Sequence, residues 1–309
     1  MKSAPVLAAA VCFQLALAHA PVALAQQPAA PAAQAPAAQT PAPGRGRGPA
    51  PVDSRVQIRM HHFADTKEDI PYAIFVSSKV ARGRKAPMIV SLHGLGGTHT
   101  TMMRPNAIDL AEAGGYILLA PMGYNPRGWY GIPAGPPRRG GPPPNAAPNA
   151  TGATPARQGR PGGAFAGAND PPNVRELSEK ETLEVVDLVR KEFNVDDDRT
   201  YLMGHSMGGA GTYYLAVKYP RRWAAIAAIA PAAFGLQASS LNAIPRMPVM
   251  VVHGDMDTAV PVSLSRTWVE VMKALKMPHQ YIEVAGGDHG SVISSHQAEI
   301  FAFFATHSK

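Results

Sequence analysis

The sequence predicts an α/β fold in which a mostly parallel central sheet carries helices on both faces. Three observations lead to this prediction. The chain has 309 residues, of which 46% are hydrophobic, and this is enough to bury a sizeable core. Short apolar runs alternate with helix-length amphipathic stretches. Finally, 19 of the 31 prolines fall in two segments, 26–52 and 126–172, which leaves the remainder able to form regular elements.

The elements expected before the second proline-rich segment are four strands and one helix. The strands are 55–63, 70–76, 88–92 and 116–120, and the helix is 102–113. The third strand ends in His93-Gly94 and the fourth ends at Pro121, and glycine and proline are both residues that interrupt regular structure.

Strands and helices continue to alternate after that segment. Ser178 followed by Glu181 forms a capping-box pattern, which predicts that a helix begins there and runs to about Phe193. The remaining expected elements are strands at 201–203, 249–252 and 280–284, a further apolar run at 224–230, and helices at 207–219, 262–275 and 294–305. Sheets of this kind bind ligands at the carboxyl ends of their strands, so the chemistry is expected there.

The sequence predicts one folded domain preceded by two segments with other roles. Residues 1–25 have the positively charged start, apolar stretch and small-residue cleavage site of a signal peptide, with cleavage before Gln26. Residues 26–52 predict a flexible Ala/Pro/Gln/Arg-Gly linker, because they offer little surface to bury. Residues 53–309 form the expected domain, with a Pro/Gly/Arg-rich insertion at about 126–172. We therefore expect an exported protein, periplasmic or extracellular, with no transmembrane segment after signal removal.

Charge and cysteine usage narrow the possible partners. The net charge of +7 lies mainly in Arg/Gly/Pro segments rather than on a patterned helix face, so specific nucleic-acid binding is not expected. A non-enzymatic, polyanion-binding envelope protein on the same scaffold is the alternative of a different class. The one cysteine, Cys12, lies in the signal peptide, so the mature chain has neither a disulfide nor a thiol nucleophile.

Ser206 is the candidate nucleophile. It stands in Gly204-His205-Ser206-Met207-Gly208, between an expected strand and an expected helix. A serine on this tight turn is lifted to the top of the sheet, and side chains at positions 204 and 208 would collide with neighbouring elements. The pattern alone is common, so the strand-turn-helix context carries the prediction.

A serine hydroxyl needs a base to take its proton, and the base needs an acid to hold its tautomer. His289 follows the last expected strand and is the candidate base. Asp255 and Asp257 both follow the strand before it, and we favour Asp257 because it lies deeper in the turn. The other histidines near these loops, among them His93, His205 and His253, are expected to make structural hydrogen bonds.

The candidate oxyanion hole consists of two backbone amides. One is that of Met207, which follows the nucleophile, and the other is that of Leu95 in the glycine-rich loop after strand 88–92. A phosphate-binding loop is the competing interpretation, but no Lys-Ser/Thr follows and the glycine spacing does not fit a dinucleotide site. No His/Asp cluster has the spacing of metal ligands, so no metal is expected.

Several of these motifs together resemble the secreted bacterial esterases of the α/β-hydrolase fold. They are Leu92-His93-Gly94-Leu95-Gly96-Gly97, Val174-Arg175-Glu176-Leu177-Ser178, residues 201–209, residues 253–261 and Gly287-Asp288-His289-Gly290. The chain is similar to polyhydroxybutyrate-depolymerase-like and feruloyl-esterase-like proteins and to the catalytic domain of prolyl-oligopeptidase-like hydrolases, over roughly 55–124 and 173–307. The order Ser, Asp, His is that of the α/β-hydrolases. The resemblance implies an acyl-serine mechanism on an ester or related acyl bond.

The insertion leaves the sheet at its catalytic edge. Trp129 and Tyr130, near its start, are therefore candidate substrate-binding residues, with anchoring of the loop to the body as the alternative.

Taken together, these expectations describe an exported serine esterase of the Ser-His-Asp type acting on a small-molecule or polymeric ester, with no cofactor. A prolyl-oligopeptidase-like peptidase is the nearer alternative, although the N-terminal segment of about 50 residues is too short for a gating propeller domain. Acyl and alcohol specificity and oligomeric state are left open.

Overall fold

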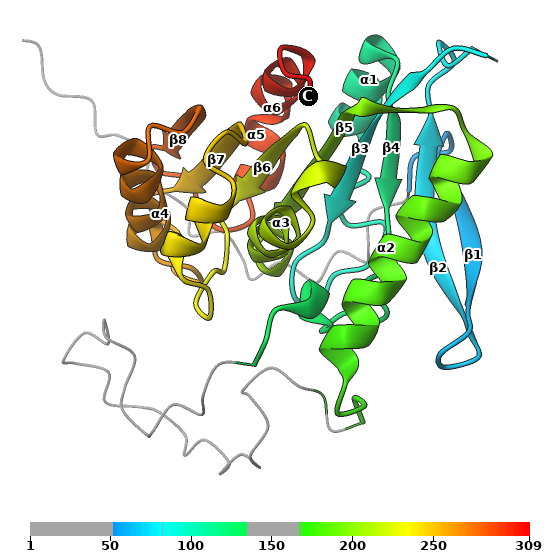
Figure 1. The fold of residues 1–309 in the computed structure, drawn as a ribbon, viewed down its shortest axis with the longest axis horizontal. Coiled ribbons are helices and arrows are strands. Elements are labelled where there is room, and N and C mark those ends of the chain that lie inside the picture. Colours follow the sequence, from blue (N-terminus) through cyan, green and yellow to red (C-terminus); the bar gives the residue numbers. More distant parts are fainter. Residues whose placement is uncertain (1–51, 82, 135–166, 168) are drawn as a thin grey trace, which may run out of the picture. The chain divides into compact units, whose positions relative to one another are not determined.

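The structure, a computed structural model, describes residues 52–81, 83–134, 167 and 169–309. The expected signal peptide and most of the linker and insertion lie outside these residues. Within them a sheet of eight strands runs in the order β1-β2-β4-β3-β5-β6-β7-β8 (Figure 1). The strands are β1 Gln57–Phe63, β2 Glu68–Val76, β3 Ala86–Leu92, β4 Ile117–Ala120, β5 Val195–His205, β6 Ala225–Ile229, β7 Val249–Gly254 and β8 His279–Val284.

The sheet is parallel except at one edge. β2 pairs antiparallel with β1 and with β4, whereas all pairs from β4 through β3 to β8 are parallel. The predicted mostly parallel sheet is therefore confirmed. Since parallel strands end at the same edge, the loops after β3, β4, β5, β6, β7 and β8 meet there.

Helices cover both faces of this sheet (Figure 1). They are α1 Pro105–Gly114, α2 Val174–Glu192, α3 Met207–Lys218, α4 Val262–Ala274, α5 Val292–Ser295 and α6 Gln297–Ala305, with 3-10 turns η1 Trp129–Gly131, η2 Pro220–Arg222 and η3 Ala238–Ala243. The α2, α3 and α4 helices pack in one core cluster, and α1, α5 and α6 pack in the other. No helix in the described ranges is long and apolar enough to cross a membrane.

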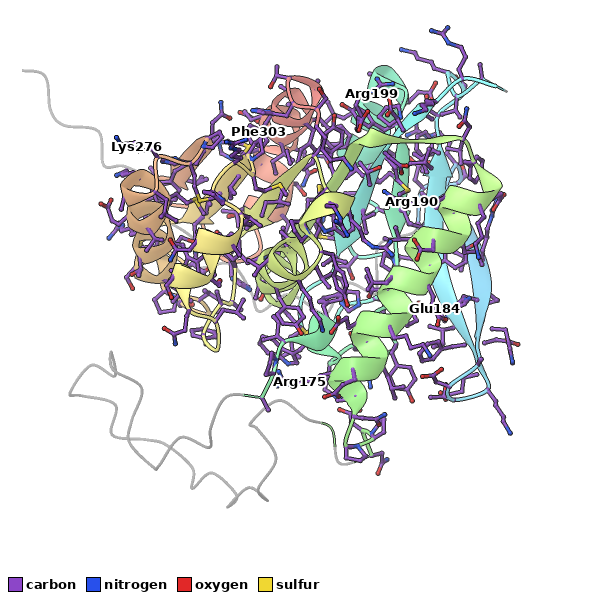
Figure 2. All side chains as sticks on the ribbon, in the orientation of Figure 1. Arg175, Glu184, Arg190, Arg199, Lys276 and Phe303 are labelled. Carbon is purple, nitrogen blue, oxygen red and sulfur yellow. The ribbon has the colours of Figure 1, made fainter. Side chains whose placement is uncertain are left out.

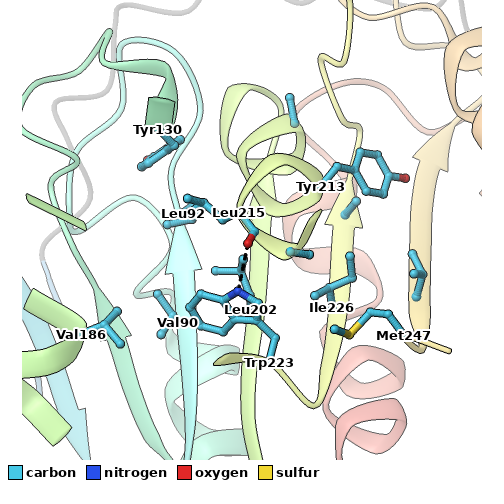
Figure 3. Close-up of a cluster of buried hydrophobic side chains, with 14 of the residues drawn as sticks. Val90, Leu92, Tyr130, Val186, Leu202, Tyr213, Leu215, Trp223, Ile226 and Met247 are labelled. Carbon is cyan, nitrogen blue, oxygen red and sulfur yellow. Dashed lines mark hydrogen bonds between the residues drawn. The ribbon is translucent and has the colours of Figure 1, made fainter. Parts of the chain in front are cut away.

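The core explains why the central strands are almost entirely apolar. Every residue of β3, β4, β6 and β7 is buried, as expected for strands with helices on both faces. Figure 3 shows the cluster on the α3 side, where the indole nitrogen of Trp223 donates to the carbonyl of Leu215 at 3.3 Å. This hydrogen bond satisfies the one polar group of the buried ring.

Among the helices, the two largest differences from the sequence predictions are at α2 and at the last predicted helix. α2 begins at Val174, directly after Pro171-Pro172-Asn173, and the capping-box prediction at Ser178 is wrong. The Ser178 hydroxyl instead accepts the backbone N–H of Tyr130 at 3.1 Å. The predicted last helix is divided at His296 into α5 and α6. For Ser178, the tertiary contact with η1 determines what the hydroxyl binds, and the local sequence does not.

Candidate active site

Ser206 lies at the turn between β5 and α3 in a strained backbone conformation. Its φ is 56° and its ψ is −114°, which is unusual for a residue with a side chain. Backbone hydrogen bonds hold Ser206 there. The Ser206 N–H donates to the Ile229 carbonyl at 2.9 Å, and the Ser206 carbonyl accepts the N–H groups of Ala232 at 2.9 Å and Ala210 at 3.0 Å. The strain raises the hydroxyl out of the sheet edge, as in a nucleophile elbow.

The two glycines around Ser206 are required by close backbone packing. A Cβ at Gly204 would lie 2.3 Å from the carbonyl oxygen of Gly208, and a Cβ at Gly208 would lie 2.3 Å from that of Leu92. Neither neighbour is a flexible side chain that could move aside. The steric reason inferred for these glycines from the sequence is therefore confirmed.

The loops after β7 and β8 bring a carboxylate and an imidazole together. The Asp257 carboxylate accepts a hydrogen bond from Nδ1 of His289 at 2.6 Å. Its other oxygen accepts the backbone N–H groups of Ala259 and Val260 at 2.9 and 2.8 Å. The Asp257 side chain is buried, whereas His289 is partly exposed. Asp257 thereby holds the Nδ1–H tautomer of His289 and leaves Nε2 able to accept a proton.

Asp255, the other candidate acid, has a different role. Its carboxylate accepts the backbone N–H of Gly286 at 2.7 Å, which ties the β7 loop to the β8 loop. It makes no contact with His289 in the structure's hydrogen-bond network. Of the two aspartates, Asp257 is the one that hydrogen-bonds the histidine.

Two further histidines support this pair. The Nε2 atom of His205 contacts the backbone carbonyl of His289 at 2.8 Å. Burial, with the neighbouring His289, lowers the pKa of His205 to about 4, so its ring is neutral and donates this bond through Nε2–H.

His253 lies beneath Asp257 and is fully buried. Its Nε2 faces the Val260 carbonyl at 2.9 Å and the Asp257 carboxylate at 3.2 Å, and its Nδ1 lies 2.7 Å from the Ser265 hydroxyl. Burial lowers the pKa of His253, so the neutral ring donates through Nε2–H and accepts from Ser265. The Asp257 carboxylate is thus surrounded by donors.

The loop after β3 approaches Ser206 from the other side. A Cβ at Gly94 would lie 3.2 Å from the Cβ of Ser206, so the backbone at this point is close to the serine. Leu95 follows directly and is exposed, while Met207 is buried as the first residue of α3. The first amides of a helix have no partner within the helix. The structure therefore brings the loop that contains Leu95 close to Ser206, which Met207 directly follows.

His93 connects this loop to the loop after β4. Its Nδ1 and Nε2 lie 2.8 Å from the carbonyl oxygens of Gly94 and Met122, respectively. Burial lowers the pKa of His93, and a neutral ring carries one N–H, so it donates to one of the two carbonyls at a time. The His93 carbonyl itself accepts the Tyr130 hydroxyl at 3.1 Å.

Trp129 and Tyr130, the predicted substrate-binding residues, are core residues. Their exposed fractions are 7% and 0%. Arg175, at the start of α2 (Figure 2), lies over the Trp129 ring with its guanidinium carbon 5.4 Å from the ring centroid. Tyr130 packs beside Leu92 (Figure 3) and against Gly211 of α3. Tyr130 has no exposed surface and Trp129 has little, so the placement matches the anchoring alternative.

A buried carboxyl group next to these loops was not among the sequence predictions. Glu181 is fully buried, and one of its carboxyl oxygens accepts the backbone N–H of Tyr124 at 3.1 Å. The other oxygen has no hydrogen-bond partner among the described residues. Burial raises the pKa of Glu181 to about 8. Its spacing of four residues from Leu177 and Val185, both buried, was a signal for burial that the capping-box interpretation obscured.

No group of three or more His, Cys, Asp or Glu side chains that could hold a metal occurs in the described part of the chain. The polar side chains at this edge of the sheet include Ser206, His289 and Asp257, with His205 and His253 hydrogen-bonded beside them.

Comparisons with known proteins find similarity to esterases. The family model described as Phospholipase/Carboxylesterase matches residues 170–308. Cutinase 2 of Thermobifida cellulosilytica is 33% identical over 95 residues, which are 31% of this chain and 34% of that protein. The bifunctional acetylxylan esterase/xylanase XynS20E of Neocallimastix patriciarum is 36% identical over 74 residues, 24% of this chain and 11% of that protein. The chain thus spans about a third or less of the length of these relatives.

Solved structures are similar over most of the chain. A thermostable esterase superposes with a TM-score of 0.59 at 24% identity, covering 82% of this chain and 64% of that one. A ferulic acid esterase from Anaeromyces mucronatus superposes with a TM-score of 0.59 at 16% identity, covering 85% and 93%. The chain has the α/β-hydrolase fold. Within this fold, Ser206 follows β5, Asp257 follows β7 and His289 follows β8.

Proposed function

We propose that this α/β-hydrolase cleaves carboxylic esters through an acyl-serine intermediate, with Ser206 as nucleophile, His289 as general base and acid, and Asp257 as the group that orients His289. The observation that carries the proposal is the 2.6 Å hydrogen bond between Asp257 and Nδ1 of His289, made by loops that end at the same sheet edge as the strained Ser206.

In the first half of the proposed reaction, the Ser206 oxygen forms a bond to the ester carbonyl carbon while its proton passes to Nε2 of His289. The carbonyl π bond becomes an oxyanion, held by the amides of Leu95 and Met207. When the carbonyl re-forms, the bond to the alcohol oxygen breaks and His289 returns the proton to it. The products of this half are an alcohol and the acyl-serine.

Water completes the cycle by the same route. His289 takes a proton from water, whose oxygen attacks the acyl carbon, and the second oxyanion is held by the same amides. Collapse releases the carboxylic acid and restores the proton to Ser206. Asp257 stabilises the imidazolium in both halves without taking a proton.

The relatives support an ester as substrate class. Cutinases and an acetylxylan esterase are among the similar proteins, and both names denote ester cleavage. We propose small-molecule or polymeric esters as substrates. Export is part of the proposal: removal of residues 1–25 would leave a mature chain beginning at Gln26, which N-terminal sequencing of protein from the producing cell tests directly.

The test of the proposal is labelling with a fluorophosphonate, read by intact mass, together with hydrolysis of p-nitrophenyl esters of increasing acyl length. We expect one adduct on the wild type and on Ser263→Ala, an exposed serine of α4, and none on Ser206→Ala. A Ser206→Ala variant that retains ester hydrolysis, or a wild type that neither reacts with the probe nor hydrolyses any ester, would refute the assignment.

A further inference from the structure

A second set of charged and polar groups lies beside the oxyanion loop. The Asp170 carboxylate accepts two hydrogen bonds from the guanidinium of Arg127, at 2.8 and 2.9 Å, and one from the Asn125 side-chain amide at 3.1 Å. The Asn125 carbonyl oxygen in turn accepts the backbone N–H of Arg127 at 2.8 Å. We call these three residues the clasp.

The clasp has the features of a strong interaction. Its arginine and carboxylate meet in the bidentate geometry that gives short, directional, charge-assisted bonds. The Asp170 side chain is only 5% exposed, whereas that of Arg127 is 40% exposed. The Arg127 guanidinium lowers the pKa of Asp170, so the carboxylate is charged near neutral pH. The Gly167 backbone N–H also donates to it.

The clasp encloses one residue that reaches the proposed oxyanion hole. Pro126 lies between Asn125 and Arg127, and its carbonyl accepts the backbone N–H of Gly96 at 2.9 Å. Gly96 directly follows Leu95, the proposed donor. A hydrogen bond at Gly96 therefore restrains the peptide unit next to the one that must face the oxyanion.

The same segment is fixed at its other end. The Met122 carbonyl faces Nε2 of His93, and the Tyr124 N–H donates to the buried Glu181. Backbone hydrogen bonds also shape this turn, from the Gly128 N–H to the Asn125 carbonyl at 3.3 Å and from the Asn125 N–H to the Gly123 carbonyl at 2.7 Å. The clasp is thus the side-chain interaction closest to the bond that restrains Gly96.

We propose that Arg127 and Asp170 are positioning residues for the oxyanion hole, acting through the Pro126 carbonyl on the Leu95-Gly96 peptide. This inference rests on the proposed function. Loosening the clasp should let the Leu95 amide depart from the direction of the developing oxyanion. Since that bond strengthens in the transition state, the loss should appear mainly in kcat, with KM little changed.

Asp170→Asn tests the proposal, because it removes the charge and one acceptor while keeping the shape of the side chain. Complete loss of an oxyanion donor costs about 10²–10³ in kcat, and we expect misplacement to cost about tenfold. The affinity for a boronic acid, which binds serine hydrolases as a tetrahedral adduct, should fall in parallel. Arg127→Lys keeps the charge but loses the bidentate geometry, so its kcat and its boronic acid affinity should lie between those of wild type and Asp170→Asn.

Asp187→Asn is the matched control. Asp187 of α2 forms a comparable pair with Arg222, at 2.6 and 3.0 Å, without a connection to the oxyanion loop. It should leave both kcat and boronic acid affinity within about twofold of wild type, as expected for a solvent-exposed ion pair. A loss of kcat in Asp187→Asn as large as that in Asp170→Asn would overturn the proposal.

Two outcomes separate this inference from the proposed function. If the wild type is labelled at Ser206 and active, but a folded Asp170→Asn keeps wild-type kcat and boronic acid affinity, the positioning role is wrong and the function stands. If Ser206 is not labelled, the proposed function itself fails. Should Asp170→Asn not fold, Arg127→Lys and Asn125→Ala provide the same comparison at a smaller perturbation.

Discussion

The two sides of the site are built in different ways. On one side, the loops after β7 and β8 place functional side chains in direct contact: Asp257 bonds His289, and His253, near the end of β7, contacts Asp257 at 3.2 Å. On the other side, the loop after β3 offers backbone amides and is held through the loop after β4, which Glu181 and Asp170 bind in turn. The acid–base side is therefore built from side chains at the ends of two neighbouring strands, and the oxyanion side from backbone that other elements hold in place.

This difference has a chemical cause. Proton transfer requires particular side chains, so an imidazole and a carboxylate must stand at fixed places after their strands. An oxyanion hole requires amide N–H groups, which nearly every residue possesses. What must be specified there is the direction of the backbone, and any distant group that fixes the direction will serve.

Asp257→Asn should lower kcat by about 10⁴, because an amide in place of the carboxylate no longer holds His289 in the tautomer that accepts a proton from serine. KM should change little. Steady-state kinetics on one p-nitrophenyl ester measures both constants.

Asp255→Asn is the control for that variant, since Asp255 lies two residues away and only accepts the Gly286 N–H. We expect a loss of less than about tenfold, in line with one exposed hydrogen bond. Equal losses of kcat in the two variants would show that Asp257 acts by stabilising the conformation of the loop and not through its hydrogen bond to His289.

Glu181→Gln should change how stability depends on pH. The pKa of Glu181 in the folded protein, about 8, lies above the pKa of a glutamate in the unfolded chain. The contribution of Glu181 to the free energy of unfolding is therefore greatest below the unfolded-state pKa and is lost as the pH rises to about 8. Across that window the wild type should lose on the order of a few kcal/mol, whereas Glu181→Gln should show a much smaller slope. Urea unfolding at a series of pH values measures this. Parallel curves for the two proteins would mean that Glu181 is not the buried group responsible.

Tyr130→Phe should destabilise the protein by about 1 kcal/mol, because the His93 carbonyl loses the donor that now lies 3.1 Å away. The oxyanion loop should also become less ordered, with a kcat reduced a few-fold.

Tyr213→Phe is its matched control. The Tyr213 ring is equally buried, stacked on Trp268, and its hydroxyl has no hydrogen-bond partner within the described residues. Its replacement should be neutral or stabilising. If thermal unfolding shows the same loss of stability in both variants, the Tyr130 hydroxyl contributes no more to stability than the Tyr213 hydroxyl does.

The sequence was sufficient for the parts in which local chemistry dictates the residue. Alternating apolar and amphipathic stretches predicted the parallel sheet with helices on both faces, and the structure confirms it. The glycines at 204 and 208 were explained by steric requirements that the backbone distances bear out. The position of Asp257 deeper in its turn indicated the carboxylate that hydrogen-bonds His289.

The sequence was insufficient where tertiary contacts override local pattern. Ser178 has the spacing of a helix cap, yet its hydroxyl bonds Tyr130 inside the core. Tyr130 looked like a substrate contact because it follows a catalytic-edge strand, but it is buried against α3. Arg127 and Asp170 stand 43 positions apart, and no periodicity relates two residues at that separation.

In the proposed mechanism, Ser206 carries the acyl group during turnover. Rapid acid quench of the enzyme with excess p-nitrophenyl acetate, followed by peptide mass analysis of the tryptic segment 200–218, measures this directly. We expect one acetyl group on that segment at Ser206, absent in Ser206→Ala and accumulating in step with the burst of p-nitrophenol. Turnover with no acetylated serine, or with an acetyl group on another residue at the same rate, would contradict it.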